Sequence, residues 1–262
     1  MSQEKDVLLR HDSGGVATLT MNRPKQRNAL SGGLMAAIQG ALDSIARDRA
    51  VKAVVLAANG PVYCAGHDLR EMRAMPGRQA LEALFRQCSA MMLSILRLPK
   101  PVIAKVQGTA TAAGCQLVAT CDLAVASTKA RFATPGVNIG LFCSTPAVAL
   151  SRAVGRKPAM EMLLTGEPVT AREALRIGLI NRAVAPTRLD AETAALARRV
   201  ASKSPLTVKI GKENFYRQLE MGIEQAYDQV SRAMAENMLA LDAEAGIDAF
   251  LEKKPEPEWK GR

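Results

Sequence analysis

The segment QGTATAAGCQLVATCD, residues 107–122, carries the main clue to the fold of this chain. It joins an apolar run typical of a buried strand (PVIAKV, 101–106) to a helical run (CQLVAT) through a tract of small residues. Small side chains let a ligand approach the backbone closely. The first amides of a helix lack intrahelical acceptors and favour negative charge. We therefore predict a strand-to-helix turn that holds an anionic oxygen.

Gln116 stands in this segment where an acid–base side chain is expected. A carboxamide cannot exchange protons near neutral pH. The turn is thus suited to polarising a carbonyl group, but it lacks a proton carrier at the obvious position.

The bulk composition is that of a soluble globular protein. Of 262 residues, 48% are hydrophobic and 23% are charged, which is enough for a sizeable core. The opening MSQEKDVLLR has no apolar core of a secretory signal. No stretch approaches the roughly 18 apolar residues of a membrane span. The sequence therefore predicts neither secretion nor a membrane span.

The cysteines predict reduced thiols in the cytoplasm. They are odd in number and lack paired spacing, so each is expected to be a small buried side chain. With two histidines in the chain, no zinc site is expected. The five positions are Cys64, Cys88, Cys115, Cys121 and Cys143.

The net charge of +10 suggests an anionic partner, but it does not identify one. The basic residues are scattered, and aromatic residues make up 3% of the chain, which argues against a nucleic-acid binder that stacks bases. A phosphate-bearing small molecule explains the charge as well as nucleic acid does. An incidentally basic surface remains the third alternative.

Hydrophobic periodicity predicts an α/β core. A hairpin is expected over 7–23, and a helix follows Ser31 as N-cap. Buried strands are expected at 52–58, 101–106 and 122–127, with a long helix from about 78 to 98. Buried strands that alternate with helices are typical of parallel sheets.

The sequence pattern changes after residue 145, where helix signals replace the alternation of strands and helices. Pro146 lies just inside an expected helix start, with Ser144 or Thr145 as its cap. Thr170 opens a capping box, and Gly178 is expected to end that helix. From about 187 to 251 the pattern is almost entirely amphipathic helix, and no flexible linker separates it from the core. We predict two lobes in one folding unit.

Two loops could each supply a backbone donor. The first is CAGHDL (64–69), and the second is TAAGCQ (111–116). One amide from each loop would make the converging pair that an oxyanion hole requires. Each signal is weak by itself, because a glycine turn after a strand is common.

Together, the motifs of this chain resemble the crotonase (enoyl-CoA hydratase/isomerase) superfamily. The resemblance extends over nearly the whole chain, in family order, up to AFLEKK at 249–254. Its markers are RNAL (27–30), CAGHDL (64–69), GTATAAGCQL (108–117), CDLAVAS (121–127), FATPGVNIGL (132–141) and TGEPVTAREALRIGLIN (165–181).

The resemblance implies the crotonase fold, which is a repeated ββα spiral core followed by a C-terminal helical subdomain. The core is expected over 1–186 and a helical trimerisation region over 187–262. It also implies a homo-trimer or hexamer and an acyl-CoA ligand, with no separate cofactor and no metal.

The family pattern also assigns site residues. The oxyanion donors would be the amides of His67 and Ala113. The backbone of Ala65, Gly66, His67, Asp68 and Leu69 would line an adenine pocket. The phosphates or the adenine edge would contact Lys25, Arg27, Phe250 and Lys253, although Phe250 could instead be a core contact.

Two positions depart from the hydratase pattern. The glutamates that the resemblance implies would fall at Gln116 and Gly136. General acid–base groups contribute roughly 10² to 10⁴ in rate. We therefore expect hydratase activity to be weak or absent, and Gln116→Glu combined with Gly136→Glu to increase it.

Two further functions stay open. The chain could be a non-catalytic acyl-CoA-binding protein. It could also decarboxylate malonyl-type thioesters. The sequence AGHD resembles that of family members in which the histidine, here His67, helps to hold the carboxylate. Those enzymes carry a tyrosine about where Cys143 stands.

Overall fold

The computed structural model describes residues 6–262, and two sheets organise its core. The larger sheet has the order β1-β2-β3-β5-β7-β10. Its strands are β1 (Leu8–Ser13), β2 (Val16–Met21), β3 (Ala53–Ala58), β5 (Val102–Val106), β7 (Leu123–Ser127) and β10 (Arg182–Val184). β1 and β2 form the predicted antiparallel hairpin, and all other neighbours are parallel.

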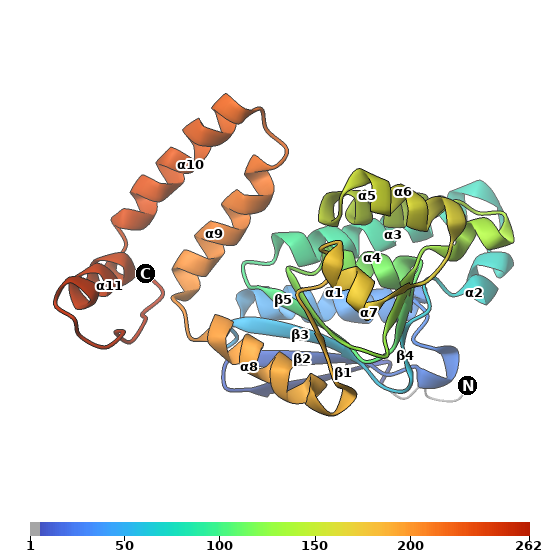
Figure 1. The fold of residues 1–262 in the computed structure, drawn as a ribbon, viewed down its shortest axis with the longest axis horizontal. Coiled ribbons are helices and arrows are strands. Elements are labelled where there is room, and N and C mark those ends of the chain that lie inside the picture. Colours follow the sequence, from blue (N-terminus) through green and yellow to red (C-terminus); the bar gives the residue numbers. More distant parts are fainter. Residues whose placement is uncertain (1–5) are drawn as a thin grey trace.

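Helices cover both faces of this sheet, which explains its apolar central strands (Figure 1). The core on one face includes buried residues of α1 (Gly32–Arg47) and α3 (Gly77–Arg97). On the other face, α8 (Leu189–Ala201) packs Leu189 and Ala197 against Val55 and Ile103. The strands predicted at 52–58, 101–106 and 122–127 are confirmed.

The smaller sheet places the site loops side by side. It has the order β4-β6-β8-β9, with β4 (Val62–Cys64), β6 (Thr109–Thr111) and β8 (Arg131–Ala133) parallel and β9 (Val169–Thr170) antiparallel. Each long strand β3, β5 and β7 is thus followed by a short strand in the second sheet. This repeat confirms the predicted ββα spiral core, and it adds the strand β6 inside the small-residue tract.

Most helix starts follow their predicted caps. Ser31 Oγ accepts the amide of Leu34, and Thr170 Oγ1 accepts that of Glu173. The exception is α5 (Ser144–Ala153), which begins one or two residues earlier than predicted. Its N-cap residue is Cys143, which makes no side-chain capping hydrogen bond. The remaining helices of the core are α2 (Leu69–Ala74), α4 (Ala113–Thr120), α6 (Arg156–Thr165) and α7 (Ala171–Arg176), with 3-10 turns η1 (Pro24–Gln26), η2 (Pro135–Ile139) and η3 (Pro186–Arg188).

Three C-terminal helices extend away from the core as an arm (Figure 1). They are α9 (Pro205–Gln218), α10 (Ile223–Met238) and α11 (Leu241–Leu251). α8 also belongs to the predicted C-terminal region, but it packs on the sheet. The buried Lys212 ties α9 to the core, since its Nζ donates to Asp122 Oδ2 at 2.7 Å and to two backbone carbonyls. No helix within residues 6–262 has the length and apolarity needed to cross a membrane.

Candidate active site

The loop after β4 and the turn before α4 meet at Gly66. This residue has φ +91°, and a Cβ there would lie 2.9 Å from Ala112 Cβ and 3.3 Å from the amide nitrogen of Ala113. Gly114 is equally constrained, because a Cβ there would lie 2.2 Å from the carbonyl oxygen of Cys64. The glycines of the two loops therefore allow two backbones to touch.

The amides of His67 and Ala113 donate to no acceptor among the hydrogen bonds of residues 6–262. Their neighbours are bonded: the amide of Asp68 donates to Leu30 at 3.2 Å, and that of Ala112 donates to a β8 carbonyl at 2.9 Å. Two free N–H groups thus come from the two loops that pack at Gly66. Such a pair can bind an anionic oxygen.

Ala112 holds the turn in a strained conformation. It has φ +50° and ψ −120°, and it caps α4 without a side-chain hydrogen bond. A non-glycine residue in this region costs about 1–3 kcal/mol, and such strain is commonly retained at functional sites.

His67 lies half-buried beside α3. Its ring contacts that of Phe85 edge-on, with centroids 5.3 Å apart, and its Nε2 has no partner among the described residues. Burial lowers the pKa of His67 below its ordinary value. The imidazole is therefore neutral near pH 7.

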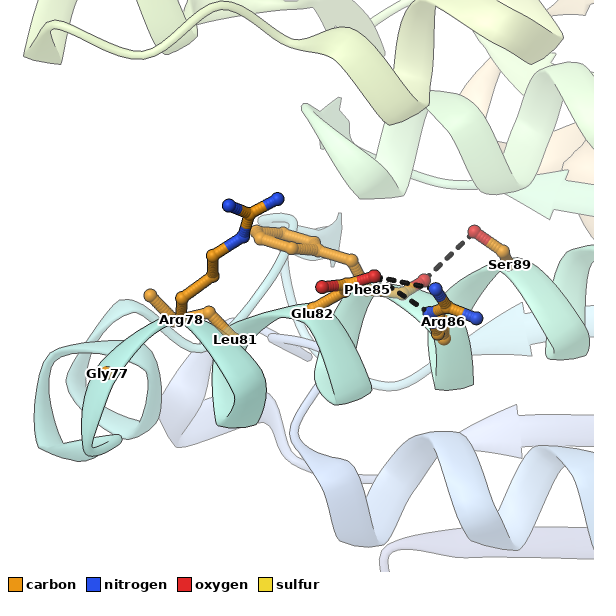
Figure 2. Close-up of a pocket in the computed structure, with 7 residues that line it drawn as sticks. All are labelled: Gly77, Arg78, Leu81, Glu82, Phe85, Arg86 and Ser89. Carbon is orange, nitrogen blue, oxygen red and sulfur yellow. Dashed lines mark hydrogen bonds and ion pairs between the residues drawn. The ribbon is translucent and has the colours of Figure 1, made fainter.

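A groove of about 680 Å³ runs along α3 next to this ring. Figure 2 shows Phe85 and Arg78 on one side of the helix and Arg86 paired with Glu82. The lining residues are Gly77, Arg78, Leu81, Glu82, Phe85, Arg86 and Ser89. Phe85 had no signal in the sequence beyond helical periodicity, so its contact with His67 could not be predicted.

Gln116 lies at the first turn of α4 and is buried, with 5% of its surface exposed. Its side-chain Oε1 has no partner in the described part of the chain. It lines a second groove, of about 1580 Å³, between α3, α4, α5 and α9. Ser89 lines both grooves, so the two meet along α3.

The turn that contains Gly136 leaves no space for a side chain at this position. A Cβ there would lie 2.5 Å from the carbonyl oxygen of Leu141 and 2.9 Å from Cys143 Sγ. A glutamate at this position would therefore displace the turn, which corrects the expectation that Gly136→Glu simply adds a proton carrier. Burial raises the pKa of the Cys143 thiol, so this group is a weak nucleophile.

The residues predicted to contact coenzyme A fall into two groups. Lys25 and Arg27 are exposed, and the carbonyl of Arg27 accepts the amide of Ala65 at 3.1 Å, so η1 and the CAGHDL loop are adjacent. Phe250 and Lys253 belong to the far end of the arm, remote from β4 in the same chain (Figure 1).

Asp68 and Leu69 differ in their freedom to bind a ligand. The Asp68 carboxylate caps α2 and pairs with Arg23 at 3.3 Å, so its side chain is already engaged. Leu69 is half exposed at the first position of α2. The carboxylate of Asp68 therefore holds the loop in place.

The chain is similar to proteins of one family over most of its length. A family model described as Enoyl-CoA hydratase/isomerase matches residues 11–262. A human protein named "Enoyl-CoA hydratase domain-containing protein 3, mitochondrial" is 48% identical over 94% of this chain and 80% of its own length. The corresponding mouse protein is 47% identical over 94% and 81%.

Solved structures agree with this likeness. The crystal structure of an enoyl-CoA hydratase from Mycobacterium smegmatis is 55% identical and has a TM-score of 0.95, covering 97% of this chain and 99% of that one. The human domain-containing protein 3 structure is 46% identical, with a TM-score of 0.93 over 96% and 99%.

The cytoplasmic location predicted from the cysteines is wrong. The mouse, rat and human relatives are named as mitochondrial proteins, which contradicts it. Reduced thiols and a charged N-terminus do not specify a compartment, because compartments are addressed by separate targeting segments.

Proposed function

Because the chain belongs to the enoyl-CoA hydratase/isomerase family, we propose that it binds an acyl-CoA thioester and stabilises its enolate in a backbone oxyanion hole. The amides of His67 and Ala113 are the two donors. The observation that carries this proposal is that both are unpaired in loops that touch at Gly66. Removing one donor from such a hole typically slows an enzyme by about 10² to 10³.

Ordinary hydration is expected to be weak or absent. Adding water to a double bond requires a group that takes a proton from the water and one that gives a proton to the α-carbon. Gln116 can hold a water molecule but cannot deprotonate it. Gly136 has no side chain at all.

The coenzyme A moiety is proposed to lie along the CAGHDL loop, with Lys25 and Arg27 near its phosphates. Phe250 is 82% exposed on the arm, and it cannot reach that loop within one chain. We propose that Phe250 and Lys253 act on the site of a neighbouring subunit in a trimer or hexamer. Sedimentation velocity tests this, and a monomer would contradict it.

A direct test separates binding from turnover. We expect butyryl-CoA to bind in a calorimeter, and the thioester carbonyl of [1-¹³C]butyryl-CoA to shift downfield in NMR spectra, because two donors polarise it. Crotonyl-CoA should lose its conjugated absorbance little faster than in buffer. Binding without a carbonyl shift would contradict the oxyanion hole, and rapid loss of absorbance would contradict weak hydration.

A non-catalytic binding protein is the alternative if the carbonyl shifts but no thioester reacts. A malonyl-type decarboxylase is a further alternative, favoured by the neutral, unpartnered Nε2 of His67, which could donate to or accept from the carboxyl region. In that reaction the bond to the carboxylate breaks, CO₂ leaves, and the electron pair passes to the thioester enolate, so no base is needed. CO₂ release from methylmalonyl-CoA, with His67→Asn as control, tests it.

A further inference from the structure

The segment RNAL, residues 27–30, pairs with the CAGHDL loop around one of the two free amides. Its last residue, Leu30, forms a parallel bridge with His67. The amide of Leu30 donates to the carbonyl of Gly66 at 2.8 Å. The carbonyl of Leu30 accepts the amide of Asp68 at 3.2 Å. The residues on either side of His67 are thus bonded to the same partner.

This pairing decides where the amide of His67 points. In a parallel bridge, one residue bonds to the two neighbours of the residue opposite it. The residue opposite then directs its own N–H group away from the bridge. The amide of His67 therefore faces away from Leu30, and the position of the RNAL segment sets the direction of this donor.

Asn28 holds the RNAL segment in place. Its side chain is completely buried, and its φ of +51° is a left-handed conformation that asparagine adopts more readily than most residues. Its Nδ2 donates to the carbonyls of Asn59 at 2.9 Å and Val62 at 2.8 Å. Its Oδ1 accepts the amide of Arg23 at 2.9 Å. Because Val62 begins β4, the carboxamide ties the RNAL segment to the strand that leads into the CAGHDL loop.

Arg23 adds a second connection between the same two segments. Its Nη1 donates to the carbonyl of Ala29 at 2.7 Å, and its Nη2 donates to Asp68 Oδ2 at 3.3 Å. The side chain of Arg23 is only 11% exposed, so this connection is shielded from solvent. Since Asn28 Oδ1 binds the backbone amide of Arg23, the carboxamide also fixes the point from which the guanidinium extends.

We propose that Asn28 is a positioning residue of the oxyanion hole. Its carboxamide is fully engaged inside the protein, so it acts on the thioester only through the segment that it holds. That segment, through Leu30, directs the amide of His67 toward the thioester oxygen. Donors of this kind must be held within about 0.5 Å of their productive position. The inference rests on the oxyanion hole proposed above and identifies the side chain that orients one of its two donors.

The test replaces Asn28 and observes the thioester carbonyl directly. Asn28→Gly tolerates the positive φ and removes all three side-chain hydrogen bonds. The carbonyl of bound [1-¹³C]butyryl-CoA should lose about half of its downfield NMR shift, because one of two donors is misplaced. The dissociation constant measured by calorimetry should rise only about threefold to tenfold, which corresponds to one neutral hydrogen bond.

A second variant, Asn28→Asp, separates side-chain shape from hydrogen bonding. It keeps the volume and the acceptor for the amide of Arg23, but it places an oxygen against the carbonyls of Asn59 and Val62. The carbonyl shift should decrease as it does in Asn28→Gly. If Asn28→Gly fails to fold, the shift in Asn28→Asp decides.

Thr193→Ala is the matched control for a general loss of stability. Thr193 is buried on α8, and its hydroxyl donates to the carbonyl of Leu189 at 2.8 Å. Its loss should lower the free energy of unfolding in urea and leave the carbonyl shift unchanged. An equal loss of shift in this control, or a full shift in a folded Asn28 variant, would overturn the positioning role and leave the oxyanion hole intact. No shift in the unmodified protein would overturn the oxyanion hole and this inference together.

Discussion

Gly66 and Ala112 lie in contact where the two loops of the candidate site meet. A methyl group added at Gly66 would clash with Ala112. A Cβ at position 66 would lie 2.9 Å from that of Ala112 and 3.1 Å from the carbonyl oxygen of Thr111. Both residues have positive φ angles. The convergence of the free amides therefore depends on a glycine facing a strained alanine.

Gly66→Ala should damage both folding and binding. The added methyl must displace the α4 turn, and the φ of +91° disfavours any residue other than glycine. We expect a loss of about 2–4 kcal/mol in the free energy of unfolding, measured by urea denaturation, and loss of butyryl-CoA binding. Gly66→Ala with full stability and affinity would contradict the close approach.

Ala112→Gly should partly rescue Gly66→Ala. It removes the nearest contact atom and relieves the positive φ at position 112, whereas the contact with the Thr111 carbonyl remains. A double-mutant cycle should give a favourable coupling of about 1–2 kcal/mol. Strict additivity would show that the two residues do not interact.

The free energy of unfolding should decrease in acid because of His67. Burial lowers its pKa below the ordinary value of 6.5, so the unfolded chain binds this proton at a higher pH than the folded chain does. The contribution of His67 to the free energy of unfolding is fully present above pH 6.5, and it is lost as the pH falls toward the lowered pKa. Urea denaturation at about pH 7.5 and about pH 5.5 should show a smaller difference in His67→Asn than in the unmodified protein.

Gly136→Ala should destabilise the protein by about 1–3 kcal/mol, because its methyl would lie 2.5 Å from the Leu141 carbonyl oxygen. Gly33→Ala is the matched control, since its Cβ would meet no atom closer than 3.9 Å. Differential scanning calorimetry compares the two. We also expect Gln116→Glu with Gly136→Glu to yield less folded protein than Gln116→Glu alone, contrary to the expectation from the sequence.

Lys212→Met should weaken the attachment of the arm. It removes the cation from a buried pair with Asp122 and leaves that carboxylate with Tyr216 and the amide of Val102 as partners. Breaking one side of a buried pair typically costs about 3–5 kcal/mol. Lys209→Met, at an exposed position of the same helix, should cost little. Equal stability of the two variants would contradict the anchoring role.

Local pattern predicted much of the fold. The hairpin, the helix capped by Ser31 and the buried strands depend on residues within a few positions of one another, so periodicity and capping chemistry were sufficient. The start of α5 was predicted late because Ser144 and Thr145 look like caps, yet the chain enters the helix from Cys143 without one.

The candidate site was only partly readable. The sequence indicated Gly66, the TAAGCQ turn and the uncharged Gln116, since glycine and carboxamide chemistry are fixed by residue type. It did not indicate Phe85 against His67 or the unpaired side-chain oxygen of Gln116, because a missing hydrogen bond is a property of everything that surrounds an atom.

The sequence alone thus determined the element types, the position of the two glycine loops, the family resemblance and the absence of a carboxylate at 116 and 136. Only the tertiary structure decided that Gly66 meets Ala112, that position 136 has no room for a side chain, and that α8 joins the core while α9–α11 extend from it. The physical reason is range. Propensity and capping act within one turn of chain, whereas close packing and hydrogen-bond satisfaction depend on atoms brought together from distant segments.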